Sequence, residues 1–128
     1  MATELIDPLE SVLKKDNRYA REAYAFVFES LEFTLNKIGE RRHVTGPELL
    51  DGLRQLAINK FGMLAKMVFN HWGVYKTDDF GEIVFNLVET GLMGKTKDDS
   101  RKDFQDVFIF DEVFDIKFVM KIKDLDKG

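Results

Sequence analysis

The sequence predicts a mostly α-helical small domain of three to four main helices with a short C-terminal β-strand or hairpin. Apolar residues recur with the helical period through most of residues 17–93, and single glycines stand where helices would end. From Asp115 onward the pattern alternates, as in a half-buried strand. A chain of 128 residues fits one domain. We therefore interpret 1–128 as a single domain with a helical core at 17–93, a surface loop at 94–103, and a C-terminal β element and tail at 104–128.

Two helices are expected in the first part of the chain. Asp7 and Pro8 suit an N-cap and a first-turn position, which predicts a short helix from Pro8 to Lys15. A long helix is predicted from Asn17 to Ile38, with Gly39 just past its end. This helix also carries aromatic residues outside its main apolar stripe, namely Tyr19, Phe26, Phe28 and Phe33. It should therefore face either two layers of the core or a second subunit.

The next helix has the clearest start signal in the chain. Thr45, Pro47 and Glu48 form a capping-box pattern in which the threonine hydroxyl accepts the Glu48 amide and the glutamate reaches back. One apolar face then continues as far as Trp72, and Gly62 in its middle predicts a bend.

A further helix is expected from the residues that follow Gly73. Thr77, Asp78 and Asp79 supply a cap with acids in the first turn, and the apolar stripe continues to Gly91. The polar, aperiodic run from Gly94 to Asp103 reads as the surface loop.

The end of the chain predicts a β-hairpin. The apolar run Val107–Phe110 would form one strand and Asp115–Lys123 the other, with Asp111–Phe114 as the turn. In the second strand Ile116, Phe118, Met120 and Ile122 would share the buried face. An isolated hairpin is marginally stable in water, so this one should pack on the helices or add to another strand.

Composition excludes several classes of protein. The chain has no cysteine, so disulfides and thiolate zinc sites are excluded, and a cytoplasmic location is favoured. No signal-type segment and no run of 18 apolar residues occurs, so no membrane association is expected. The net charge is −4 and both signs are spread through the chain, so the sequence shows no basic patch of the kind that binds the phosphate backbone of nucleic acid. Three helices followed by a hairpin is also the order of a winged helix, but the segment from Asp78 to Thr90 carries acids and no lysine or arginine, which makes DNA reading unlikely.

Two turns carry the candidate interaction residues. Arg41, Arg42 and His43 precede a helix N-terminus and could together hold an anion or an acidic segment of a partner, although a solvated turn is the simpler interpretation. The second turn is formed by His71, Trp72 and Tyr75. We assign no catalytic, cofactor-binding or metal-binding residue and expect no cofactor, because two separated histidines make no recognisable metal site.

The sequence favours a non-enzymatic protein-interaction or regulatory module that self-associates. Twelve phenylalanines give more apolar area than three or four helices readily cover, which suggests a homodimer or another protein partner. The alternative is a small-molecule-binding protein or enzyme that uses a pocket in the turn from His71 to Asp79. A filled core at that turn would disfavour this alternative.

Four strings of the sequence resemble a family of small bacterial proteins without an assigned activity. They are YAREAYAFVFESL, RHVTGPELLDG, FGMLAKMVFNHWGV and TDDFGEIVFNLVETGLM, within a resemblance that covers residues 17–114. It implies a stand-alone cytoplasmic protein and adds no catalytic residue. The order of helices and the stretches Val44–Gly46, Glu48–Gly52 and Trp72–Val74 are also similar to one repeat of the amino-terminal substrate-binding domain of Clp-type ATPases, although Leu49 replaces the histidine of that repeat's glutamate-histidine pair.

Overall fold

The computed structural model describes residues 7–115, 117 and 119–121, and this part of the chain is mostly helical, without strands. The α-helices are α1 (Glu10–Lys15), α2 (Arg21–Ile38), α3 (Gly46–Phe61), α4 (Ala65–His71), α5 (Thr77–Glu89) and α6 (Phe110–Val113), with 3₁₀ helices η1 (Gly62–Leu64) and η2 (Arg101–Phe104). None of the described helices is long and apolar enough to cross a membrane. The predicted mostly helical fold is confirmed.

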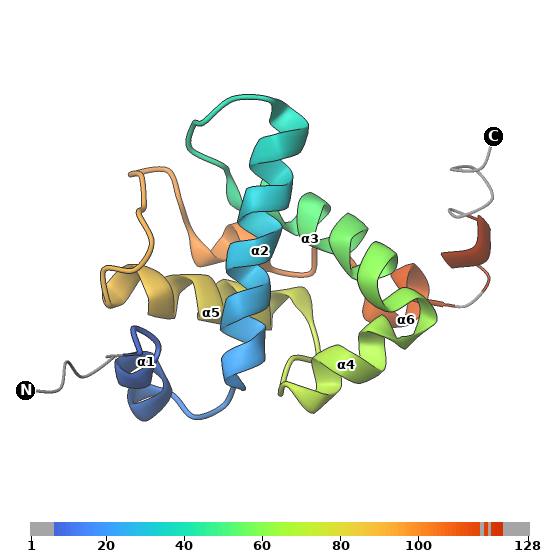
Figure 1. The fold of residues 1–128 in the computed structure, drawn as a ribbon, viewed down its shortest axis with the longest axis horizontal. Coiled ribbons are helices and arrows are strands. Elements are labelled where there is room, and N and C mark those ends of the chain that lie inside the picture. Colours follow the sequence, from blue (N-terminus) through green and yellow to red (C-terminus); the bar gives the residue numbers. More distant parts are fainter. Residues whose placement is uncertain (1–6, 116, 118, 122–128) are drawn as a thin grey trace, which may run out of the picture.

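Helix α2 is the centre of the arrangement. It packs along α3 and crosses α5, while α1 lies near the start of α2 and α4 lies with α6 on the other side of the molecule (Figure 1). Ala23, Tyr24 and Val27 are fully buried, and Phe26 on another side of the helix is buried as well. Because α2 is buried on more than one side within a single chain, its extra aromatic residues are explained by the core.

The ends of α2 and α3 follow the predicted chemistry. Gly39 ends α2 with φ of +85°, a left-handed conformation that glycine adopts without steric cost. The Thr45 side chain accepts the Glu48 amide, and the Thr45 amide donates to the Glu48 carboxylate at 3.0 Å. Gly62 has φ of +56° and ψ of −131°; it ends α3 and begins η1, which separates α3 from α4. The predicted capping box and the bend at Gly62 are both confirmed.

The start of α5 differs in detail from the predicted cap. Asp79 accepts the backbone amides of Tyr75 and Lys76, at 2.9 and 3.3 Å, and therefore closes the first turn. Thr77 instead is fully buried, and its hydroxyl donates to the carbonyl of Phe104 at 2.6 Å. The threonine thus connects α5 to η2 and does not cap its own helix.

Phe69 on α4 is the centre of an aromatic cluster. Its ring centroid lies 5.1 to 6.3 Å from those of Phe26, Phe61, Trp72, Phe80, Phe110 and Phe114. Apart from Phe118, which lies outside the described residues, every phenylalanine is buried or half-buried. The aromatic surplus that suggested self-association is therefore covered within the chain.

The predicted C-terminal β element is not what the structure shows. The run Val107–Phe110 forms no strand, and the predicted turn is part of α6. Beyond it, Lys117 and residues 119–121 are helical, and the Val119 amide donates to the Asp115 carbonyl at 3.0 Å. Val119 is 1% exposed and Met120 is 55% exposed, which reverses the predicted faces. Ile116, Phe118 and Ile122 lie outside the described residues.

A physical reason favours helix over hairpin here. No strand among the described residues offers an edge for pairing, whereas a helical turn satisfies its own backbone hydrogen bonds. The Asp115 carboxylate also accepts the Lys117 amide at 2.8 Å, as a helix N-cap does. The alternation of apolar and charged residues was too short to outweigh these local interactions.

Candidate functional site

A cavity of about 370 Å³ lies where α2, α5 and the start of α3 meet two loops. One loop is the turn between α2 and α3, and the other runs from the end of α5 to η2; both are at the upper left of Figure 1. Its apolar lining comes from Leu31, Leu35, Val44, Leu49, Val84, Phe85, Val88, Met93 and Phe104. Five of these side chains, including Leu35 and Phe85, are buried. The cavity therefore has fixed apolar walls.

Phe104 is the wall residue whose position is most closely determined. A Cβ added at Gly46 on α3 would lie 3.0 Å from its ring, and one at Gly81 on α5 would lie 2.7 Å from its Cβ. The Thr77 hydroxyl accepts the Val107 amide at 3.1 Å while it donates to the Phe104 carbonyl. Two glycines and one buried hydroxyl thus let η2 close one side of the cavity.

The rim of the cavity is held together by His43 and Asp99. The His43 Nε2 atom lies 3.1 Å from the Asp99 carboxylate, and the Thr96 amide donates to the same carboxylate at 2.8 Å. Burial raises the pKa of Asp99, but these two hydrogen bonds outweigh it and hold the pKa below its ordinary value. The contact joins two loops that are far apart in sequence, so it fixes the width of the opening.

The arginines beside His43 are paired within the chain. Arg41 donates to Glu32 at 3.0 and 3.1 Å, away from the cavity lining. Arg42 lines the cavity and donates to Glu48 at 2.7 Å. The Arg42 guanidinium and the Thr45 amide lower the pKa of Glu48 to about 2. Of the three residues predicted in this turn, Arg42 and His43 lie at the cavity, and Arg41 does not.

Lys95 is a cavity residue that the sequence interpretation did not select. Its Nζ atom lies 5.5 Å from the centre of the Phe85 ring, and among the described residues no carboxylate forms an ion pair with it. The sequence interpretation placed it in a surface loop at 94–103, of which residues 101–103 belong to η2, and a single lysine in a mixed-charge stretch gives no signal of its own. Only the folded position beside Phe85 distinguishes it from Lys97.

The second predicted turn has a different character. The Trp72 ring packs 5.6 Å from Phe26 and 5.8 Å from Phe61, as part of the aromatic cluster. His71 and Tyr75 are exposed, and Tyr75 retains 66% of its accessible surface. None of His71, Trp72 and Tyr75 lines the cavity. Trp72 contributes to a filled core, which is the arrangement that disfavours a pocket here.

The acids of this turn also have structural partners. Asp79 accepts the Tyr19 hydroxyl at 2.7 Å, in addition to the backbone amides at the start of α5. Burial and the hydrogen bond to Asp79 raise the pKa of Tyr19 well above its usual range. Asp78 accepts the Asp106 amide at 3.1 Å. Both carboxylates therefore hold loops and a helix terminus in place.

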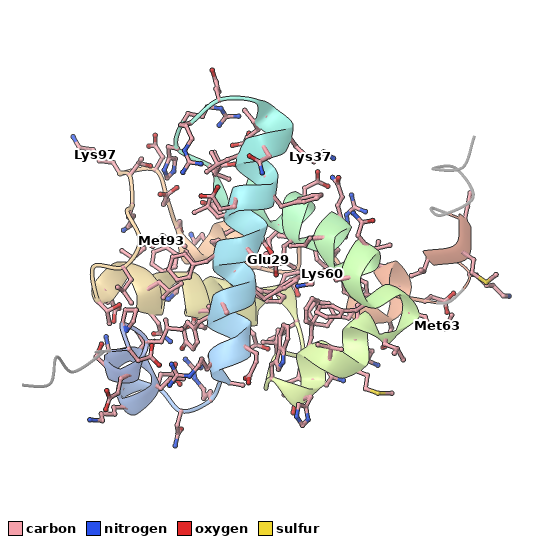
Figure 2. The ribbon with its side chains drawn as sticks, viewed as in Figure 1. Glu29, Lys37, Lys60, Met63, Met93 and Lys97 are labelled. Atoms are coloured by element: carbon pink, nitrogen blue, oxygen red, sulfur yellow. The ribbon has the colours of Figure 1, made fainter. Side chains whose placement is uncertain are left out.

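Metal binding finds no support in the part of the chain that the structure describes, where no group of three histidines and carboxylates converges. The charged side chains between α2 and α3 are paired across the surface instead, as Lys60 and Glu29 are at 2.8 Å (Figure 2). The cavity at His43 therefore carries the strongest binding geometry of the described residues.

Comparison with known proteins identified no relative of this chain. No family model matches the chain, and no curated protein and no solved structure is similar to it. The resemblance of its four sequence strings to a family of small bacterial proteins stays an expectation. The function must therefore be argued from the cavity and its chemistry.

Proposed function

We propose that this protein is a non-enzymatic interaction module that takes up apolar side chains of a partner protein in the cavity at the His43 turn. The observation that carries this proposal is the contrast between the cavity's walls and its rim. The walls are apolar and come mostly from α2, α3, α5 and η2, while His43, Lys95 and Thr96 at the rim are exposed. An apolar recess with a polar rim is the usual design of a recognition site.

The size of the cavity supports side chains as its occupants. Small-molecule and cofactor sites span about 300 to 1,000 Å³, and this cavity of about 370 Å³ lies near the lower end. It suits one or two apolar side chains that enter from a bound peptide segment, which is how anchor residues fill pockets at protein interfaces.

The proposed partner is a different chain and not a second copy. Self-association was expected because of uncovered aromatic residues, but the described phenylalanines are buried or half-buried. The exposed large apolar side chains, such as Met67 and Ile109, do not line this cavity. Binding of a second copy of the chain is the alternative, and sedimentation at micromolar concentration would reveal it as a dimer.

The test uses N-acetyl-leucine amide and N-acetyl-phenylalanine amide as probes of the cavity, with amide chemical shifts as the readout. We expect shifts at Leu31, Val88 and Thr96, because these residues line the cavity from three different segments. Filling it with Val88→Trp should abolish the shifts. Val107→Trp is the matched control, since Val107 is 44% exposed and lies outside the cavity lining.

Two results would contradict the proposal. One is the absence of any localised shift at millimolar probe, which would mean that the cavity does not admit apolar side chains. The other is that Val88→Trp and Val107→Trp weaken the shifts equally. Thermal unfolding of both variants checks that each is folded before its binding is compared.

A further inference from the structure

Most of the charged side chains around the cavity already have hydrogen-bonding partners within the chain. Arg42 is paired with Glu48 at 2.7 Å and Glu40 at 3.2 Å, and His43 contacts the Asp99 carboxylate. Asp99 receives its second hydrogen bond from a backbone amide. Arg42 and all three acids therefore already bond to groups of the chain itself.

Lys95 is the exception among the charged residues that line the cavity. No described carboxylate forms an ion pair with it, and its ammonium group lies 5.5 Å from the centre of the Phe85 ring. Arg101 lies 4.8 Å from the same ring but is paired with Glu82 at 3.3 Å. The mouth of the apolar cavity thus carries an ammonium group that no carboxylate of the described residues pairs with.

An ammonium group in this position favours a carboxylate on whatever enters the cavity. A charge-assisted hydrogen bond is stronger than a neutral one, and because Lys95 is exposed this bond would be weakened by water and salt as surface ion pairs are. The chain as a whole carries a net charge of −4, so it gives an acidic partner no long-range attraction. Selection for an acid at this site would therefore depend on Lys95 itself.

We propose that the partner segment is a hydrophobic-acidic peptide, with a leucine-type side chain in the cavity and a neighbouring Glu or Asp carboxylate on Lys95. This inference rests on the proposed function and names the chemistry of its partner. It differs from the expectation drawn from the sequence, in which Arg41, Arg42 and His43 would hold the acid. Those three groups have partners within the fold, whereas Lys95 has none among the described residues.

The test compares two fluorescein-labelled peptides, Leu-Glu-Leu-Leu and Leu-Gln-Leu-Leu, by anisotropy. Because Lys95 is exposed, its pairing should contribute as surface ion pairs do, and the Glu peptide should bind about three- to fivefold more tightly at low salt. That preference should fall as NaCl is raised. Lys95→Gln should remove it and leave the affinity for the Gln peptide unchanged.

Lys97→Gln is the matched control for the charge. Lys97 is exposed on the same loop, lies outside the cavity lining and points away from the body of the molecule (Figure 2). We expect this variant to keep the full preference for the Glu peptide. Lys95→Glu should reverse the preference in favour of a Leu-Lys-Leu-Leu peptide.

The possible failures separate the two proposals. If both peptides bind the native chain equally, and Val88→Trp abolishes the binding of each, the role of Lys95 is wrong while the cavity function stands. If the Lys97→Gln variant loses the preference for the Glu peptide as fully as Lys95→Gln does, the preference comes from the overall charge of the loop, and the proposed contact with Lys95 is contradicted. If neither peptide binds, both proposals are contradicted.

Discussion

The Thr34 hydroxyl occupies the space that a side chain at Gly52 would need, since only 1.9 Å separates its Oγ1 atom from the ideal Cβ position there. Both residues are buried, and they lie where α2 and α3 pack against each other. The Thr34 hydroxyl donates to the Ser30 carbonyl at 2.7 Å, so its position is fixed within its own helix. The close approach of the two helices therefore depends on the absence of a side chain at residue 52.

Gly52→Ala should destabilise the protein. Alanine favours a helix by about 1 kcal/mol over glycine, but the new methyl group must displace Thr34, and overpacking costs about 1 to 3 kcal/mol or more. We expect a net loss of about 1 to 2 kcal/mol in the free energy of unfolding, measured by urea denaturation. Gly94→Ala is the control, because a Cβ at that exposed position meets nothing within 4 Å.

A second substitution makes the prediction for Gly52 specific. Thr34→Ala removes the Oγ1 atom and should restore part of the stability lost in the Gly52→Ala variant. If the two effects simply add, the proposed steric conflict between these residues is contradicted.

Thr77→Val should weaken the attachment of η2. The variant removes a buried hydroxyl that bonds both the Phe104 carbonyl and the Val107 amide, and leaves these two groups unpaired. We expect a loss of about 1 to 3 kcal/mol in stability, together with faster amide exchange at Val107. Thr90→Val is the control, because it also replaces a hydroxyl by a methyl group but this hydroxyl bonds only to carbonyls of its own helix. We expect Thr90→Val to lower the free energy of unfolding by less than Thr77→Val does. Equal losses would argue against a special role for Thr77.

Asp16→Asn should reduce stability at neutral pH but much less in acid. Hydrogen bonds from Arg18, with a further one from Asn86, outweigh the effect of burial and hold the pKa of the Asp16 carboxyl well below its ordinary value. A depressed pKa in the folded state stabilises the protein above about pH 4, and this contribution is lost as pH falls toward the folded value. We expect a difference of about 1 to 2 kcal/mol at pH 7 that narrows below pH 4.

The measurement for Asp16 is the urea midpoint of both proteins from pH 7 to pH 2.5. Asp98→Asn provides the control, because Asp98 is exposed and has no ion pair among the described residues. A difference between native protein and Asp16→Asn that stays constant over the whole pH range would contradict the assignment.

The helices were predictable because their signals are local. The capping box of Thr45 and Glu48, the terminal Gly39 and the bend at Gly62 each depend on a few neighbouring residues, and the structure shows all of them. The C-terminal strand was not predictable in the same way. A strand needs a partner elsewhere in the chain, and the short alternation after Asp115 gave no information on whether one exists.

The site was predictable only in part, and for the same reason. A basic turn before a helix identified Arg42 and His43, which lie at the cavity. The sequence could not show that Asp99 would face His43, or that Lys95 would lie over Phe85, because these contacts join segments that are distant along the chain. The sequence interpretation also selected Trp72 as part of the second turn, although the ring packs in the aromatic cluster.

Because the contact between His43 and Asp99 joins two loops, the proposed recognition surface is discontinuous along the chain. Its walls come from residues 31–49 and 84–104, so neither stretch alone would reproduce the binding surface as an isolated peptide. The rim, in contrast, lies largely on the short 94–99 segment outside the packed helices. Exchanging a few residues there could redirect the module to a new partner while the helical scaffold stays as it is.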